Sequence, residues 1–345
     1  MPSLPPLDIK KNINHAPHVF ILGAGASLAA FPDGDRNGRK LPLMRNMVEI
    51  VGLETLLQSH DITTGYDDFE SLYDGLSTNS ENKDLLIELE EKIRSYFSAM
   101  RLPDEATIYD FLLLSLRTKD VIATFNWDPF LAEAVKRNRH IKNLPRIIFL
   151  HGNVDVGACI EHNTKGFLEH KCSVCGKQLE ATPLLFPVKH KDYRSNPFIK
   201  SEWDELQSYL ERAYLITVYG YSAPATDVEA RDLLLKAWEA NDTRDLGEVE
   251  IVDIRPKDEL EASWKDFFVR QHYYIFDNIE RSLTYKHVRR SCEAFAMATL
   301  QQTPWAENHY TDSKNLEDIH AWLKQLLDEE DADYLTGTPC VYTKP

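Results

Sequence analysis

Apolar runs along the chain predict buried strands that alternate with helices. Three unbroken runs end at Gly23, Asn126 and Gly220, in HVFILGA (18–24), DVIATFNWD (120–128) and AYLITVYGYS (213–222). Two more, RIIFLHGNVD (146–155) and EVEIVDIRP (248–256), have the same character. Unbroken apolar strands are typical of parallel sheets that helices cover on both faces. The pattern therefore predicts an α/β fold built on a Rossmann-like, doubly wound parallel sheet.

Changes in this pattern suggest how the chain is divided. We expect a flexible leader at 1–17, a sheet domain at 18–256 and a mixed, largely helical C-terminal extension at 257–345. Within the sheet domain, 61–117 is helical and acidic, as in ENKDLLIELEEKIRSYFSAM, which predicts a helical insertion between strands. Residues 156–180 break the alternation and contain three cysteines, so we expect a small separate module there.

Composition and charge narrow the function classes. The 345 residues carry a net charge of -16, which argues against direct nucleic-acid binding because phosphate contacts need clustered Lys and Arg. No apolar run reaches the roughly 18 residues that a membrane helix needs. The first residues contain no apolar signal-peptide core, so we expect a cytoplasmic protein that does not engage a membrane.

The turn after the first strand is a candidate nucleotide site. Gly23 and Gly25 flank Ala24 and would let the backbone approach a pyrophosphate, whose charge the following helix N-terminus favours. The dinucleotide fingerprint G-x-G-x-x-G has a third glycine where this chain has Leu28. A tight strand-to-helix turn without a ligand explains the two glycines equally well.

Polar residues follow the second and third strands at the edge where parallel sheets bind ligands. Asn126 could hydrogen-bond a sugar hydroxyl, and Asp128 could accept from an amide. An Asx turn leading into a helix, with Asp128 as its cap and Pro129 at its first position, is the competing interpretation. His151 is a candidate general base, although a lone histidine is more often structural.

The last two strands end in similar candidates. Gly220 and Ser222 in YGYS could meet a phosphate or a ribose, and Asp253 in VDIRP could bind ribose hydroxyls. Each of these residues could also belong to an ordinary loop.

The cysteine-rich segment predicts a structural zinc site. Two pairs have two-residue gaps, as closed tetrahedral zinc sites do: Cys159 with His162, and Cys172 with Cys175. His170 competes for the fourth position. A redox C-x-x-C is the alternative, but no helical pattern follows it. The remaining cysteines, Cys292 and Cys340, are expected to be free thiols.

Taken in order, these motifs resemble the sirtuin-like (Sir2-like) NAD-binding family. The resemblance covers about residues 18–256. It consists of GAGAS (23–27) followed by Pro32-Asp33, T-x-N-x-D in TFNWD (124–128), His151-Gly152 with a zinc knuckle directly after it, YGYS and VDIRP. Sirtuins carry GAGxS in the first turn, so the absent third glycine agrees with the resemblance.

The resemblance implies a role for each motif. The backbone around Ala24 and Gly25 would hold the pyrophosphate of NAD, and His151 would be the general base. Asn126 and Asp128 would contact the nicotinamide ribose and carboxamide. The catalytic residues would be Asn126 and His151, and the cofactor-binding residues Gly23, Ala24, Gly25, Ser27, Asp33, Thr124, Asp128, Gly220, Ser222 and Asp253.

Two departures favour one branch of the family. The protein deacylases have Gln where this chain has Phe125, and they place a Phe-Gly-Glu strand after the zinc module to pair with the peptide. Here that stretch is TPLLFPVKHKDY (182–193), whose two prolines lack backbone donors. The chain looks more like bacterial sirtuin-like proteins that hydrolyse NAD, many of them effectors of anti-phage defence that a protein partner or oligomerisation gates.

We therefore expect an NAD hydrolase that releases nicotinamide and ADP-ribose, with NAD as substrate and a structural Zn²⁺. The alternatives are an NAD-dependent protein-lysine deacylase and a non-catalytic sensor of NAD or ADP-ribose.

Overall fold

The computed structural model describes residues 16–188, 192–223, 227–270, 272–311 and 313–336. Most of the leader expected at 1–17 lies outside the described residues, as does Cys340. Within the described part, no helix has the length and apolar character needed to span a membrane.

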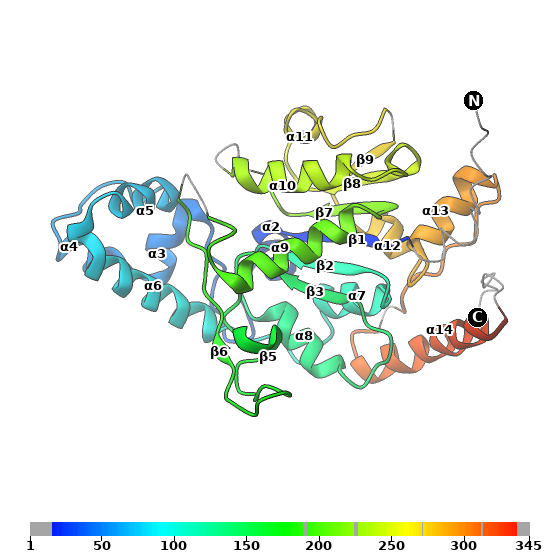
Figure 1. Cartoon of the computed structure of the whole chain (residues 1–345), viewed down its shortest axis with the longest axis horizontal. Helices are drawn as coiled ribbons and strands as arrows, with labels where there is room; N and C mark the ends of the chain where they lie inside the picture. The colour runs from blue at the N-terminus through cyan, green and yellow to red at the C-terminus, as the bar shows by residue number, and fades with distance from the viewer. Residues whose placement is uncertain (1–15, 189–191, 224–226, 271, 312, 337–345) are drawn as a thin grey trace.

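A parallel sheet of six strands forms the centre of the molecule, in the order β3-β2-β1-β7-β8-β9 (Figure 1). Its strands are β1 (His18–Leu22), β2 (Val121–Thr124), β3 (Arg146–Phe149), β7 (Leu215–Tyr219), β8 (Glu248–Val252) and β9 (Tyr273–Phe276). The direction of chain progression reverses between β1 and β7, and ligands bind beyond the carboxyl ends of strands at such a switch point. The prediction of a Rossmann-like doubly wound sheet is confirmed.

Alternation along β1 shows why both faces of the sheet are covered. Phe20 and Leu22 pack into one apolar cluster, whereas Val19 and Ile21 pack into another on the opposite face. Successive strand side chains point to opposite faces, so a strand buried on both sides is apolar throughout.

The covering helices follow from these two clusters. One face packs against α2 (Ala24–Ala30), α7 (Ile108–Ser115) and α8 (Phe130–Asn138). The other packs against α9 (Pro197–Leu210), α10 (Val228–Glu239) and α11 (Lys257–Trp264).

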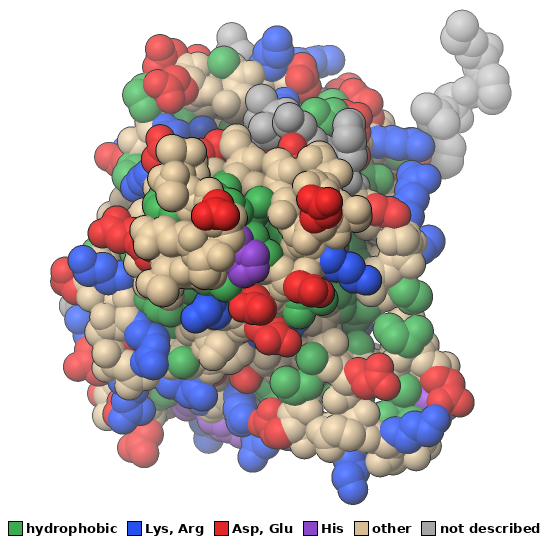
Figure 2. All heavy atoms as spheres, turned by 90° about the vertical axis from the view of Figure 1, so that its left-hand side faces the viewer, with side chains coloured by type: hydrophobic (Ala, Val, Ile, Leu, Met, Phe, Trp, Pro, Cys, Tyr) green, Lys and Arg blue, Asp and Glu red, His purple; other side chains and the backbone are tan. Residues whose placement is uncertain are grey.

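A helical lobe projects from one end of the sheet, at the left of Figure 1. It contains α3 (Met47–Val51), α4 (Glu54–Gln58), α5 (Phe69–Ser77) and α6 (Lys83–Ser98), preceded by the 3-10 turn η1 (Met44–Asn46). Four apolar residues spaced by four along α6 are all buried: Leu85, Leu89, Ile93 and Phe97. Figure 2 shows the molecule from the lobe's side, with acidic and basic side chains intermixed around apolar ones.

The strand β9 was not among the five that the sequence analysis expected. It pairs with β8 through Val249 to Val252 and lies beyond residue 256, where we placed the end of the sheet domain. Its residues are only partly buried, Tyr274 being 55% exposed, because it is an edge strand. It therefore lacks the unbroken buried pattern of the central strands.

The part of the C-terminal extension that follows β9 packs at the amino ends of the strands, away from the switch point. It contains α12 (Leu283–Lys286), α13 (Ser291–Leu300) and α14 (Leu316–Thr336). The fully buried His18 of β1 hydrogen-bonds Ser291 at 2.8 Å, and burial lowers the pKa of His18 to about 3. The buried guanidinium of Arg289 pairs with Glu330 and so ties α14 to the core.

A small antiparallel sheet, ordered β5-β4-β6, forms a separate module after β3. Its strands are β4 (Val156–Cys159), β5 (Thr164–Phe167) and β6 (Glu180–Ala181), with the 3-10 turn η3 (Ile160–His162) between the first two. The partly buried ammonium of Lys165 lies 2.6 Å from Glu202 of α9, which fixes the module to the main domain.

Two glycine turns meet at the switch point. β1 ends at Leu22, α2 begins at Ala24, and the Gly25 N–H donates to the Gly220 carbonyl at 2.9 Å. Gly220 has a φ of +66°, and a Cβ there would lie 2.1 Å from the Ala26 nitrogen. A residue with a side chain at 220 would therefore be strained and would also push the two turns apart.

We predict that Gly220→Ala lowers the free energy of unfolding by about 2 kcal/mol or more, through left-handed strain and backbone overlap. Gly75→Ala is the matched control. Gly75 lies inside α5, and its added Cβ would meet nothing within 4 Å, so this change should stabilise by about 0.5–1 kcal/mol. Urea unfolding measures both, and equal stabilities for the two variants would contradict the prediction.

Candidate functional site

A cavity of about 490 Å³ lies at the carboxyl edge of the sheet, between the ends of β1, β2 and β7. The turn η1 and helices α3, α5 and α6 of the lobe contribute to its wall. Nine of the residues selected from the sequence line it: Ala24, Gly25, Ser27, Asn126, Asp128, His151, Gly220, Ser222 and Asp253. Five chain segments that are distant in sequence thus converge on one space.

The other three selected residues do not line the cavity. Gly23 packs against the second turn, where an added Cβ would lie 2.4 Å from the Tyr221 Cα. Thr124 is buried, and its hydroxyl accepts from the Asn126 N–H at 3.0 Å. Asp33 is exposed on the loop after α2. Gly23 and Thr124 support the site from behind.

Ser27 is the centre of a buried hydrogen-bond network below the cavity. Its hydroxyl donates to the Asp128 carboxylate at 2.7 Å and accepts from the Asn126 side-chain amide at 2.9 Å. The phenol of Tyr109, from α7, contacts the same hydroxyl. A hydroxyl has one proton and two lone pairs, so these three partners use its whole capacity.

This network orients the Asn126 side chain. Its Nδ2 donates to both the Gly23 carbonyl, at 3.0 Å, and Ser27. Both amide protons are therefore committed, and Oδ1 is the polar atom left for a ligand. The sequence pattern singled out Asn126, and the structure presents its oxygen rather than its nitrogen.

Asp128 is held in a buried position beside Ser27. Burial raises the pKa of Asp128 to about 6, although the Ser27 hydrogen bond opposes this shift. Its other oxygen accepts from the Phe130 N–H at 3.3 Å. Asp128 thus contacts the start of the helix as expected, but Pro129 is the N-cap and α8 begins one residue later than predicted, at Phe130. The Asp128 carboxylate also lines the cavity.

His151 lies across the cavity on the loop after β3. Its ring packs edge-on against Phe125 at 4.8 Å between centroids. Its Nε2 lies 3.0 Å from the Tyr193 hydroxyl, which donates to Asp227 at 2.8 Å. The imidazole is therefore fixed on two sides at the cavity wall.

The far end of the cavity carries one acidic and one basic side chain. The Asp253 carboxylate accepts from the Arg255 side chain at 3.0 Å, and both residues line the cavity. Ile254 between them is 88% exposed at the rim. This end can offer a carboxylate to hydroxyl groups and a guanidinium to a phosphate.

The end next to the lobe is largely apolar, although Arg45 and Glu70 of the lobe also line the cavity. Met44, Met47, Phe97, Trp127 and Leu185 line it. The indole Nε1 of Trp127 is buried and has no hydrogen-bond partner among the described residues. A buried donor without an acceptor is costly, so a ligand acceptor at this position would be favourable.

Sequence reasoning missed several lining or supporting residues. Trp127 lies in TFNWD and Arg255 in VDIRP. Their polar groups next to Asn126 and Asp253 could have marked them as candidate binding residues. Tyr193 ends the stretch TPLLFPVKHKDY and Asp227 precedes α10, and only tertiary packing brings both residues to His151.

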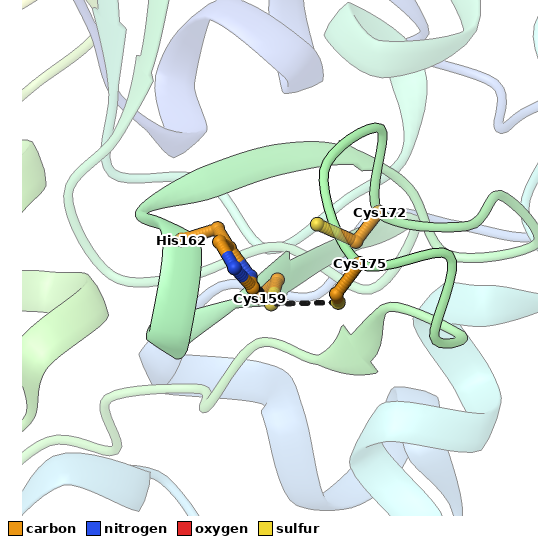
Figure 3. A group of neighbouring side chains, drawn as sticks. All are labelled: Cys159, His162, Cys172 and Cys175. Atoms are coloured by element: carbon orange, nitrogen blue, oxygen red, sulfur yellow. Dashed lines mark hydrogen bonds between the residues drawn. The ribbon is translucent and has the colours of Figure 1, made fainter.

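The three cysteines and one histidine of the small module come together (Figure 3). One ligand atom from each of Cys159, His162, Cys172 and Cys175 lies within 4.8 Å of the others. The Cys159 sulfur lies 3.9 Å from the Cys175 sulfur and 3.4 Å from the His162 Nδ1. Sulfurs bound to a tetrahedral zinc lie about 3.8 Å apart, so this set fits a closed zinc site.

The local backbone prepares this cluster for a cation. Hydrogen bonds from the Thr164 hydroxyl and from the backbone N–H groups of Cys175 and Val174 lower the pKa of Cys172 to about 6. A thiolate is the form of cysteine that binds metal. His170 instead packs edge-on against Phe167, so His162 is the fourth member.

No protein-family model matches the chain, and no curated protein matches it either. Solved structures of Sir2 proteins resemble it at low identity. A Sir2 in complex with the inhibitor EX-527, 2'-O-acetyl-ADP-ribose and deacetylated p53 peptide is 15% identical, with a TM-score of 0.39, over 85% of this chain and 96% of that one.

A Sir2 homolog–NAD complex is 16% identical, with a TM-score of 0.40, over 79% of this chain and 89% of that one. A structure from a study of the mechanism and regulation of Sir2 enzymes is 16% identical, with a TM-score of 0.39, over 86% of this chain and 99% of that one. At these values the likeness decides nothing about function, which has to be inferred from the chain's own residues.

We predict that His162→Ala removes the bound zinc and lowers the melting temperature, because a structural metal contributes folding free energy. Metal content of the purified protein measures the first effect and thermal unfolding the second. His170→Ala is the matched control, since it removes a histidine from the same module but outside the cluster. Full zinc content in His162→Ala, or its loss in His170→Ala, would overturn the assignment.

We also predict a pH-dependent effect of Asp128→Asn. The folded pKa of about 6 exceeds the ordinary aspartate pKa of 3.8, so ionisation of Asp128 lowers stability as pH rises through this window. The variant lacks this penalty. Its stability relative to the wild type should therefore increase from pH 4 to pH 7, by up to about 3 kcal/mol. A difference that urea unfolding finds constant with pH would contradict this account.

Proposed function

We propose that the chain is an NAD hydrolase that cleaves the nicotinamide–ribose bond to give nicotinamide and ADP-ribose. The observation that carries this proposal is the convergence of Asn126, Asp128 and His151 with the glycine turn in one cavity at the switch point. The order of the motifs, which resembles that of the Sir2-like family, supports NAD as the ligand.

The cavity offers groups suited to the parts of NAD. We assign the pyrophosphate to the wall formed by Ala24 and Gly25, and the adenosine side to Ser222, Asp253 and Arg255. The nicotinamide ribose would then lie between Asn126 and His151. A volume of about 490 Å³ is within the usual range for cofactor and substrate sites.

The reaction follows from these positions. The glycosidic bond breaks and nicotinamide leaves with its electron pair, while positive charge develops on the ribose. The Asn126 oxygen and the Asp128 carboxylate favour that charge. A water molecule adds to the ribose carbon, and His151 accepts its proton before releasing it to solvent.

Contacts of residues 182–188 argue against a peptide substrate. The Leu185 N–H donates to the His151 carbonyl at 3.0 Å, and Pro183 and Pro187 have no N–H. Phe186 stacks on Tyr73 of the lobe at 5.1 Å between centroids. A peptide that adds a strand needs free backbone donors and acceptors along one edge, which this segment does not offer.

A protein-lysine deacylase is the second candidate. The apolar end of the cavity, next to the lobe, favours it, because an acyl chain would fit against Met44, Phe97 and Leu185. The two candidates share the first chemical step and differ in whether an acylated peptide is required.

We further propose that the enzyme is a regulated effector of anti-phage defence in the cytoplasm, gated by a protein partner or by self-association. The lobe supports gating, because η1, α5 and α6 supply cavity residues such as Arg45, Glu70 and Phe97. A contact that shifts the lobe would therefore reshape the site directly.

We predict that the wild type converts NAD to nicotinamide and ADP-ribose, and that Asn126→Ala and His151→Ala lower turnover by about 100-fold or more. Mass spectrometry of the products, with and without an acetyl-lysine peptide, measures this. His60→Ala is the matched control, because His60 is exposed on the lobe outside the cavity.

Product formed only with peptide, as an acetylated ADP-ribose, would replace the hydrolase by the deacylase. NAD binding without any product would favour the non-catalytic sensor of NAD or ADP-ribose. Unchanged turnover in His151→Ala would show that His151 has no part in the mechanism.

A further inference from the structure

The contacts of His151 extend to two residues that no sequence motif identified. His151 Nε2 lies 3.0 Å from the Tyr193 hydroxyl, and that hydroxyl donates to the Asp227 carboxylate at 2.8 Å. Tyr193 and Asp227 are buried, at 3% and 2% exposure, so both hydrogen bonds are shielded from water. The three side chains form a continuous chain in which His151 and Asp227 both line the cavity and Tyr193 joins them from behind its wall.

The direction of hydrogen bonding along this chain is determined by chemistry. A carboxylate can only accept, so the single proton of Tyr193 is given to Asp227. The Tyr193 oxygen can then only accept from His151. Burial and the Asp227 charge raise the pKa of Tyr193, which keeps that proton on the phenol. The ring nitrogen of His151 that faces Tyr193 must therefore carry a proton.

From this geometry we propose that Tyr193 and Asp227 are positioning residues that fix the tautomer of His151, with the proton on Nε2 and Nδ1 as the base. When Nδ1 takes a proton from water, the imidazolium remains hydrogen-bonded through Tyr193 to the Asp227 carboxylate. That carboxylate stabilises the new charge, as the aspartate does in a catalytic triad. The role in catalysis rests on the proposed NAD hydrolase, whereas the tautomer does not.

The packing around Tyr193 separates this role from a merely structural one. Its ring lies 4.7 Å from the Trp203 ring and 5.8 Å from the His151 ring, between centroids. Tyr193→Phe keeps these contacts and removes only the hydroxyl. Tyr193 does not line the cavity, so it acts on the reaction through His151.

The test is a measurement of the His151 tautomer by nitrogen-15 NMR of histidine-labelled protein, with His151→Ala identifying the signal. The wild type should show the neutral ring with its proton on Nε2. Tyr193→Phe should show a mixture of tautomers, and its kcat should fall by about 10-fold or more with little change in KM. Asp227→Asn should shift the tautomer in the same direction.

Tyr273→Phe is the matched control. The Tyr273 hydroxyl donates to Glu261 at 2.9 Å, and neither residue lines the cavity. This variant should leave the His151 tautomer and turnover unchanged.

A wild-type ring protonated on Nδ1, or a tautomer unchanged in Tyr193→Phe, would overturn the proposal. A tautomer that shifts in Tyr193→Phe while the wild type cleaves no NAD would uphold the positioning role and refute the proposed function instead.

Discussion

The close approach of two glycine turns is the contact on which the cavity depends. Gly25 and Gly220 meet at the switch point of the sheet, with the N–H of one donating to the carbonyl of the other at 2.9 Å. An added Cβ at either glycine would lie within 3 Å of the opposite backbone. The two halves of the sheet are therefore in contact through these turns, and side chains from both halves line the cavity beside them. The two glycines thus allow two backbone segments to pack closely, and the same backbone forms part of the cavity wall.

Two hydrogen-bond networks orient the polar side chains of the cavity around this contact. Behind the turn, Ser27 donates to Asp128 and accepts from Asn126. The buried network, and not a ligand, therefore sets the orientation of these two side chains. Across the cavity, His151 is held by Tyr193 and Asp227. Polar groups that are oriented before a substrate arrives need little reorganisation when charge develops on it.

The central strands could be predicted from the sequence because a strand buried on both faces must be apolar along its whole length. Strand β9 could not, because its edge position leaves Tyr274 exposed and interrupts the pattern. The spacing predicted that Cys159, Cys172 and Cys175 lie together with a histidine, and the structure brings them together with His162. Spacing alone could not choose between His162 and His170, a choice that depends on how η3 turns. Tyr193 and Asp227 depend on packing between distant loops, which no local pattern records.

The central claim is that the cavity at the carboxyl edge binds NAD with its nicotinamide ribose between Asn126 and His151. A crystal structure of the His151→Ala variant with NAD tests it most directly, because that variant should bind the dinucleotide without cleaving it. The account predicts intact NAD with its pyrophosphate against Ala24 and Gly25 and its adenosine side near Asp253. NAD bound elsewhere on the molecule, or a cavity that stays empty at saturating NAD, would contradict it.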